Sequence, residues 1–264
     1  MARILTITNQ KGGVGKTTTC VNLAASLAAT KKRVLLVDLD PQGNASMGSG
    51  VDKHTLENSV YEVLTGKAKV TDAIIKNTPA RYDLIGSNGN LTAAEVELLH
   101  IPRREFRLKM ALMELDDDYD FILIDNPPSL NLLTVNALAS SAGVIIPMQC
   151  EYYALEGISA LIGTIDKINK RLNPALKIEG ILRTMFDPRM SLTKDVSNHL
   201  VEYFGDQVYR TVIPRNVRLA EAPSHGLPAL LYDKNSRGAL AYLALAGELI
   251  RRTDVEEKAQ SEEA

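Results

Sequence analysis

One octapeptide constrains this chain more than any other feature: residues 11–18 read Lys-Gly-Gly-Val-Gly-Lys-Thr-Thr. It lies between an apolar run at residues 4–8 and an alanine-rich stretch at residues 17–29, so the predicted order is strand, glycine loop and helix. Glycines let successive backbone N–H groups turn toward phosphate oxygens, and the helix adds the positive end of its dipole. Lys16 can then reach the β- and γ-phosphates, and the Thr17 hydroxyl can bind Mg²⁺. The predicted nucleotide-binding loop consists of Lys11, Gly12, Gly13, Val14, Gly15, Lys16, Thr17 and Thr18.

Apolar runs further along the chain predict the fold class. Residues 34–37, 121–124 and 144–146 are continuous rather than alternating apolar runs, as in parallel strands buried on both faces. A further strand is predicted at residues 178–185, and helical patterns lie at residues 59–64, 93–99, 106–115, 132–139, 155–172, 195–204 and 238–252. This alternation predicts an α/β fold, a doubly wound, mostly parallel twisted sheet with helices on both faces. We expect the ligand beyond the carboxyl ends of the strands, and the second strand directly beside the first.

Length and composition favour one domain. The chain has 264 residues, of which 45% are hydrophobic and 23% charged, as in ordinary soluble globular proteins. Because no repeat and no Gly/Ser-rich linker interrupts it, we expect a single domain over residues 1–252. Residues 253–264 hold five acidic groups and one lysine, so we expect a disordered acidic tail there. Cys20 and Cys150 form no C-x-x-C pair, which argues against a zinc or iron–sulfur site and indicates a reducing cytoplasm.

Carboxylates follow two of the predicted strands. Asp38 and Asp40 come at the end of the second strand, in the sequence Asp-Leu-Asp-Pro-Gln-Gly-Asn, whose turn-forming residues would also fit a simple turn. Residues 121–124 are followed by Asp125, and an apolar run that ends in Asp is the second motif of nucleotide sites. The carboxylate of such a motif holds Mg²⁺, commonly through water. We therefore predict Asp125 and Thr17 at the metal, with Asp38 contributing to the metal environment.

A second lysine, Lys11, stands at the entrance of the loop, where a standard phosphate loop does not require one. It could be an ordinary surface residue. However, the spacing K-G-G-x-G-K-[ST] resembles the ParA/MinD superfamily, the deviant Walker A branch of the P-loop NTPases. From residue 2 to about residue 252 the chain resembles chromosomal ParA (Soj-like) proteins, on the stretches 34–44, 129–138, 151–157 and 212–223.

This resemblance implies an ATPase that partitions DNA. ATP and Mg²⁺ would drive a sandwich homodimer in which Lys11 crosses to the partner subunit's nucleotide. The dimer would bind double-stranded DNA without sequence preference, and a ParB-like partner would stimulate slow hydrolysis and release it, segregating chromosome or plasmid origins. Asp40 would orient the attacking water, so Lys11, Lys16 and Asp40 are the catalytic candidates. The family commonly has Cys or another small residue after the metal aspartate, whereas Asn126 stands here, which puts the hydrogen bonding of that loop in question.

Charge is unevenly distributed along the chain. The formal net charge is −2, but residues 207–252 hold seven basic and three acidic groups. Nonspecific DNA binding needs Arg or Lys contacts to phosphates and no base readout. Arg189 and Arg218 match the DNA-contacting arginines of the family, and the basic region adds Arg215 and Arg237. The alternative is that these arginines are solvated or pair with Glu221 and Asp233.

The resemblance also implies where adenine would bind, and it leaves rival functions open. The base contacts would come from the residues after the late strands, which are Met185, Pro214, Arg215 and Asn216. A membrane-associated positioning ATPase of MinD type is one rival, but acidic residues after 252 would be repelled by an anionic bilayer. We expect no membrane binding and a cytoplasmic, nucleoid-associated protein. A metal-cluster carrier would need paired cysteines at an interface. A ligase-like enzyme that acts on a small substrate is a further alternative that the sequence does not exclude.

Overall fold

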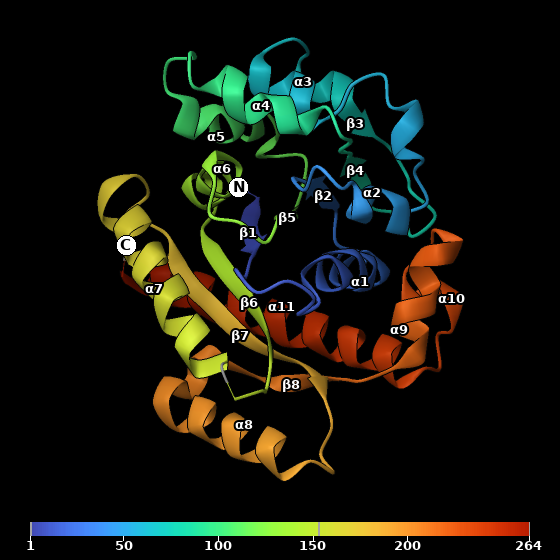
Figure 1. Cartoon of the computed structure of the whole chain (residues 1–264), viewed down its shortest axis with the longest axis vertical. Helices are drawn as coiled ribbons and strands as arrows, with labels where there is room; N and C mark the ends of the chain where they lie inside the picture. Colours follow the sequence, from blue (N-terminus) through green and yellow to red (C-terminus); the bar gives the residue numbers. More distant parts are fainter. Residues whose placement is uncertain (1, 153, 264) are drawn as a thin grey trace.

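The computed structural model describes residues 2–152 and 154–263. An eight-stranded sheet with the order β3-β4-β2-β5-β1-β6-β7-β8 forms its centre (Figure 1). Its strands are β1 Arg3–Ile7, β2 Val34–Asp38, β3 Ile74–Ile75, β4 Asp83–Ile85, β5 Phe121–Asp125, β6 Gly143–Gln149, β7 Lys177–Phe186 and β8 Val208–Pro214. Neighbouring strands are parallel except β3, which pairs antiparallel with β4 at one edge.

Helices cover both faces of this sheet. They are α1 Lys16–Ala29, α2 Asn44–Gly48, α3 Val60–Thr65, α4 Leu91–Leu98, α5 Arg107–Leu112, α6 Leu132–Ser140, α7 Ala154–Arg171, α8 Ser191–Phe204, α9 Val217–Glu221, α10 Ala229–Tyr232 and α11 Arg237–Glu263. Short 3-10 turns lie at Lys53–Thr55, Val70–Ala73, Arg104–Phe106, Met113–Leu115, Gly205–Gln207 and Ala222–His225. This arrangement confirms the predicted doubly wound α/β fold.

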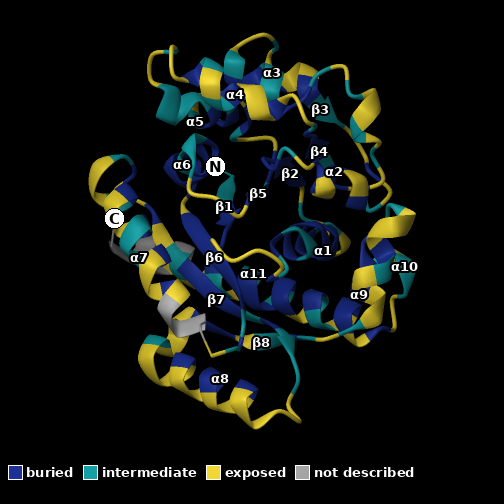
Figure 2. Ribbon diagram, in the orientation of Figure 1, coloured by how far each residue is buried: buried dark blue, intermediate teal, exposed yellow. Residues whose placement is uncertain are grey.

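Alternating side chains of the central strands build a separate core on each face. In β2, Leu36 packs with residues of α1 and α11, whereas Leu35 and Val37 pack with residues of α3 to α6. The same alternation holds in β5, where Leu123 joins the first core and Ile122 the second. All of β2 and β5 is buried, and Figure 2 shows these strands in dark blue between helices with exposed outer faces. Burial on both faces explains why these strands are continuous apolar runs.

The strand order corrects one expectation. β2 does not lie beside β1, because β5 lies between them and pairs with both. The crossover through α1 passes over the position that β5 fills later in the chain. In this register Asp125 pairs with Ile7 on one side and with Asp38 on the other. The carboxyl ends of the three strands therefore still meet at the edge where the glycine loop begins.

In the structure α11 continues through the acidic segment after residue 252 and ends at Glu263. Glu256 accepts from Arg3 of β1 at 2.7 Å and lies 2.6 Å from Lys177 of β7. These ion pairs tie the acidic helix end to the edge of the sheet at which β1 and β7 begin. Within the described residues, no helix has both the length and the apolar character needed to span a bilayer.

Candidate nucleotide site

The glycine loop connects β1 to α1 and has the backbone that its sequence predicts. Gly13 and Gly15 have φ angles of 73° and 87°, in the left-handed region that favours glycine. A Cβ at Gly15 would come no closer than 3.9 Å to another residue, so the backbone angle and not crowding requires glycine here. Thr184 of β7 donates to the carbonyl of Val14 at 2.8 Å, which fixes the loop against the sheet. α1 begins at Lys16, so its N-terminus faces the loop.

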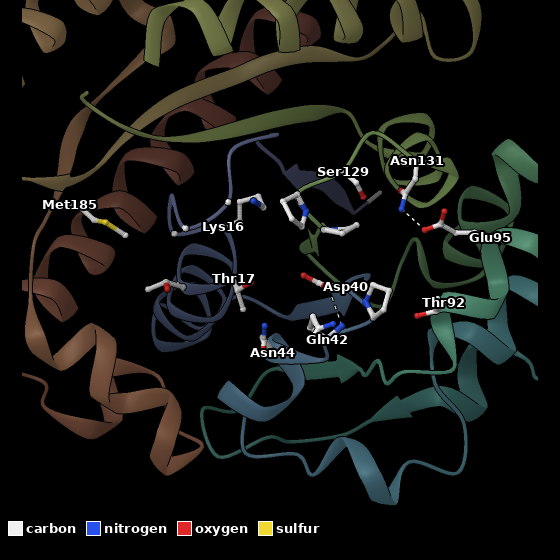
Figure 3. A pocket seen from close by; sticks show the side chains of 17 residues that line it. Lys16, Thr17, Asp40, Gln42, Asn44, Thr92, Glu95, Ser129, Asn131 and Met185 are labelled. Carbon is white, nitrogen blue, oxygen red and sulfur yellow. Dashed lines mark hydrogen bonds between the residues drawn. The ribbon is translucent and has the colours of Figure 1, made fainter. Parts of the chain in front are cut away.

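A cavity of about 640 Å³ opens beside this loop. The loop forms one wall, the segments after β2 and β5 form another, and α4 and Met185 complete the lining (Figure 3). Thr17 and Asp40 face each other across it in Figure 3. Nine lining residues were not among the predicted site residues: Pro41, Gln42, Asn44, Thr92, Glu95, Pro127, Pro128, Ser129 and Asn131. α4 carries no motif that would have indicated a place at a phosphate site.

Lys16 lines this cavity and is almost completely buried. Lys16 is 7% exposed, and its Nζ donates to the carbonyl of Lys11 at 3.1 Å. Burial lowers the pKa of Lys16, and attraction to Asp125 and Asp40 offsets part of that effect. A buried ammonium that bonds only a neutral carbonyl is stabilised when an anion enters the cavity, because the opposite charge compensates the cost of its desolvation.

Lys11 is not among the residues that line the cavity of its own chain. Its Nζ lies 2.6 Å from Oε2 of Glu151, and both side chains are about half exposed, at 48% and 46%. An ion pair this exposed contributes about 0–1 kcal/mol, so it can be exchanged for another partner at little cost. Glu151 belongs to one of the stretches that carry the family resemblance, but no sequence pattern relates it to Lys11.

The two aspartates after β2 have different surroundings. Asp38 is fully buried, and its Oδ2 accepts from the backbone N–H and the hydroxyl of Ser46, at 2.8 and 2.7 Å. Its Oδ1 accepts from the N–H of Asp40 at 3.2 Å, so both oxygens of Asp38 hold the loop and α2 in place. This geometry favours a structural role for Asp38 over the predicted metal contact. Asp40 lines the cavity, and its Oδ1 accepts from the N–H of Gln42 at 2.9 Å.

Asp125, at the end of β5, keeps one oxygen without a partner. Its Oδ1 accepts from the thiol of Cys20 at 3.3 Å, while Oδ2 is buried and meets no hydrogen-bond partner within the described part of the chain. Burial raises the pKa of Asp125 to about 8, and repulsion from Asp38 adds to that shift. The charged form of a carboxylate in this position is stabilised when a cation binds beside it. The described residues hold no group of three His, Cys, Asp or Glu that could bind a metal ion.

The side chain of Asn126 lies beside the carboxyl ends of β1 and β5. Its Nδ2 lies 3.4 Å from the carbonyls of Ile7 and Ile124, and the residue is fully buried. The loop that follows ends at Asn131, which caps α6 by accepting from Thr134 at 3.1 Å and donates to Glu95 of α4. This loop is therefore linked to α4 as well as to the end of the sheet.

A smaller cavity of about 210 Å³ adjoins the far side of the loop. Its lining includes the four residues predicted to contact adenine, which are Met185, Pro214, Arg215 and Asn216. Met185 has a φ of 48°, an unusual left-handed angle for a side chain of this size. Strain of this kind costs about 1–3 kcal/mol and is concentrated at binding sites. The structure thus brings together the late-strand residues that the sequence could relate only by resemblance.

Two of the four predicted DNA-binding arginines are paired within the chain. Arg218 lies 2.8 Å from Glu221 and 3.3 Å from Asp233, the two partners considered from the sequence. Arg189 binds both oxygens of Asp187, at 2.9 and 2.7 Å. Arg215 and Arg237 are exposed. Gly238 packs closely on Leu219, where an added Cβ would meet that side chain at 2.6 Å, so Arg237 lies beside the helix that carries Arg218.

Known proteins resemble this chain over nearly its whole length. A family model described as an AAA domain matches residues 2–178. The sporulation initiation inhibitor protein Soj of Bacillus subtilis is 55% identical over 94% of this chain and 98% of its own. The chromosome partitioning protein ParA of Myxococcus xanthus is 51% identical over 96% of this chain and 89% of its own.

Solved structures agree with the fold. Cobyrinic acid a,c-diamide synthase from Mycobacterium smegmatis, with bound ADP and magnesium, is 38% identical with a TM-score of 0.85 over 96% of both chains. The cell division ATPase MinD of Pyrococcus furiosus is 28% identical with a TM-score of 0.79, over 95% of this chain and 99% of its own. Together with the sequence relatives, they confirm the resemblance predicted from the two-lysine loop. The chain belongs to the ParA/Soj family of partitioning ATPases.

Proposed function

We propose that this protein is an ATP-dependent DNA-partitioning ATPase whose ATP-bound homodimer binds DNA. One observation carries the proposal: Lys16, Thr17 and Asp40 line one cavity beside the glycine loop, close to the buried Asp125, in a chain 51–55% identical to Soj and ParA. The cavity suits ATP and Mg²⁺, because it is lined by the ammonium of Lys16, the hydroxyl of Thr17 and the carboxylate of Asp40, with a buried unpartnered oxygen of Asp125 nearby. ATP analogue, ADP and magnesium occur in solved relatives, which supports the same cofactors here.

Each residue of the site then has a defined task. The N–H groups of residues 12–18 bind phosphate oxygens, and Lys16 compensates charge on the β- and γ-phosphates. Thr17 and Asp125 would hold the magnesium, and the ion would supply positive charge that neutralises charge developing on the phosphates. Asp40 accepts a hydrogen bond from the attacking water and places it in line with the γ-phosphate. Because the chain supplies positioning and no strong base, intrinsic hydrolysis should be slow.

Asp40→Ala should separate binding from hydrolysis. We expect ATP hydrolysis to fall by about 100-fold or more, the usual effect of removing a water-positioning group, while ATP affinity changes by less than about threefold. Phosphate release and binding of a fluorescent ATP analogue measure the two quantities. Asp72→Ala, which removes an exposed carboxylate at the turn Val70–Ala73, is the matched control and should hydrolyse ATP normally. Hydrolysis by Asp40→Ala within about threefold of wild type would exclude the assigned role.

Dimerisation would connect the nucleotide to DNA. Lys11 is held by Glu151 at the surface, so closure of two chains can exchange this weak pair for the partner subunit's phosphates. Each chain alone offers few unpaired arginines, since Arg189 and Arg218 are engaged with carboxylates. A dimer doubles the contacts and makes the second set intramolecular, which raises DNA affinity well beyond that of one chain. ATP would thus control DNA binding, and a ParB-like partner would end it by stimulating hydrolysis.

Charge reversal along α11 tests the DNA surface. Arg237→Glu should weaken binding of nonspecific duplex DNA by about tenfold in the presence of ATP and reduce its salt dependence, because phosphate contacts are replaced by repulsion. Arg251→Glu is the matched control, since it makes the same change on the same helix about 20 Å away. Fluorescence anisotropy at several salt concentrations gives both values. Equal losses in the two variants would indicate a general charge effect and no localised surface.

The function as a whole is tested by ATPase rates measured with DNA alone, with the cognate ParB alone, and with both. Synergy between DNA and ParB is the expected result, in a cytoplasmic, nucleoid-associated protein. ATP-dependent sedimentation with liposomes would instead favour a membrane-positioning ATPase. Hydrolysis that DNA and ParB leave unchanged would point to an enzyme with a small substrate, the alternative that the synthase relative keeps open.

A further inference from the structure

We propose that Cys20 is a positioning residue for the magnesium carboxylate: its S–H group holds one oxygen of Asp125 and thereby leaves the other for the metal. The inference rests on the proposed role of Asp125. Cys20 lies one turn after Lys16 on α1, at the point where this helix packs against β5. From the sequence, Cys20 is most simply a small packed residue, so a part in metal binding is new.

The contact is specific to one carboxylate oxygen. The sulfur of Cys20 lies 3.3 Å from Oδ1 of Asp125, within the range of a hydrogen bond that involves sulfur. Both residues are completely buried, so water does not compete for the bond. Oδ2 is the oxygen without a partner in the described part of the chain. A donor on Oδ1 therefore fixes the rotation of the carboxylate and decides which oxygen remains available.

The thiol is suited to act as a donor in this position. A thiol can donate one hydrogen bond, and the sulfur of Cys20 faces an oxygen that can only accept when the carboxylate is ionised. Asp38 is engaged by Ser46 and by the N–H of Asp40, and the ammonium of Lys16 bonds the carbonyl of Lys11. Groups that orient a metal ligand from behind typically change metal affinity by 10- to 100-fold when they are removed. Since a thiol is a weak donor, we expect an effect of about tenfold, at the lower end of that range.

Packing is the competing explanation, because Cys20 also belongs to the apolar core with Leu5, Leu123 and residues of α11. Three substitutions distinguish the two roles. Cys20→Ser keeps a donor, whereas Cys20→Ala and Cys20→Val both remove it while changing the side-chain volume in opposite directions. A packing role predicts effects that follow stability, with Ala leaving a void and Val crowding the helix. A positioning role predicts that Ala and Val behave alike and that Ser resembles wild type.

The experiment titrates MgCl₂ into each variant with a fluorescent, non-hydrolysable ATP analogue and records the magnesium midpoint. Cys20→Ala and Cys20→Val should raise the midpoint by about tenfold, and Cys20→Ser should stay within about twofold of wild type. Nucleotide affinity in EDTA should be the same in all four proteins, which a general distortion of the loop would not allow. Urea unfolding of the same proteins gives the stability scale for comparison.

The Asp125→Asn variant distinguishes the role proposed for Cys20 from the role proposed for Asp125. If Asp125→Asn shifts the magnesium midpoint but Cys20→Ala does not, the role of Cys20 is overturned and that of Asp125 stands. Midpoints of the three Cys20 variants that follow their stabilities would equally overturn it. If Asp125→Asn leaves the midpoint unchanged, both assignments fail.

Discussion

Lys16→Ala is expected to abolish nucleotide binding, with a loss of affinity of at least about 100-fold. Lys16 is the buried cation of the cavity, and its ammonium bonds only a backbone carbonyl in the described structure. Charge-assisted hydrogen bonds contribute about 1.5–3 kcal/mol each, and two phosphates would lose theirs together. Isothermal titration calorimetry with ATP and Mg²⁺ measures the change. Lys170→Ala, at an exposed position in the last turn of α7, removes the same charge and should bind normally.

The Lys16→Ala protein should also remain folded. Burial lowers the pKa of Lys16, which means that the fold gains little from this charge while the cavity holds no anion. We therefore expect the free energy of unfolding without nucleotide to be unchanged or slightly higher in the variant. Nucleotide affinity within about tenfold of wild type, in a folded variant, would show that the phosphates bind elsewhere.

Lys11→Ala should leave a monomer that still binds ATP. The side chain of Lys11 does not enter its own cavity, so we expect ATP affinity to stay within about threefold of wild type. Association should weaken by about 100-fold, because each of the two crossing ammonium groups would lose a charge-assisted contact to phosphate. Static light scattering with ATP and Mg²⁺ reports the mass.

Glu151→Gln is the control for this second prediction. It removes the same surface ion pair but retains Lys11, so it should dimerise at least as well as wild type. A monomeric Glu151→Gln protein would mean that the pair itself, and not the crossing lysine, supports association. ATP-dependent dimers of Lys11→Ala would contradict the crossing role directly.

The central strands were predictable because a strand that is buried on both faces consists of consecutive apolar residues. β2, β5 and β6 carry such runs, and the structure extends each by one to four residues. β8 escaped prediction because it pairs only with β7, at the edge of the sheet, and the polar residues Arg210 and Thr211 interrupt its apolar run. β4 and β3 are only three and two residues long, too short for a periodic signal. No local pattern could indicate that β5 separates β1 from β2.

The same distinction explains what could be predicted of the site. The loop and the aspartates at strand ends are local motifs, so the sequence identifies them and the sheet then brings them together. Pairs such as Lys11 with Glu151 or Cys20 with Asp125 join residues 140 and 105 positions apart. Such contacts depend on the strand order and on helix packing, which no local spacing encodes. The sequence likewise does not determine which carboxylates pair with Arg189 and Arg218.

The most direct test of the whole account is sedimentation velocity of the wild-type protein with Mg²⁺ and a non-hydrolysable ATP analogue. A species of twice the mass of one 28.9 kDa chain should form with the analogue, and a single chain should sediment with ADP. Single chains at every protein concentration with the analogue would contradict the proposal that a shared pair of nucleotides joins two copies of this protein.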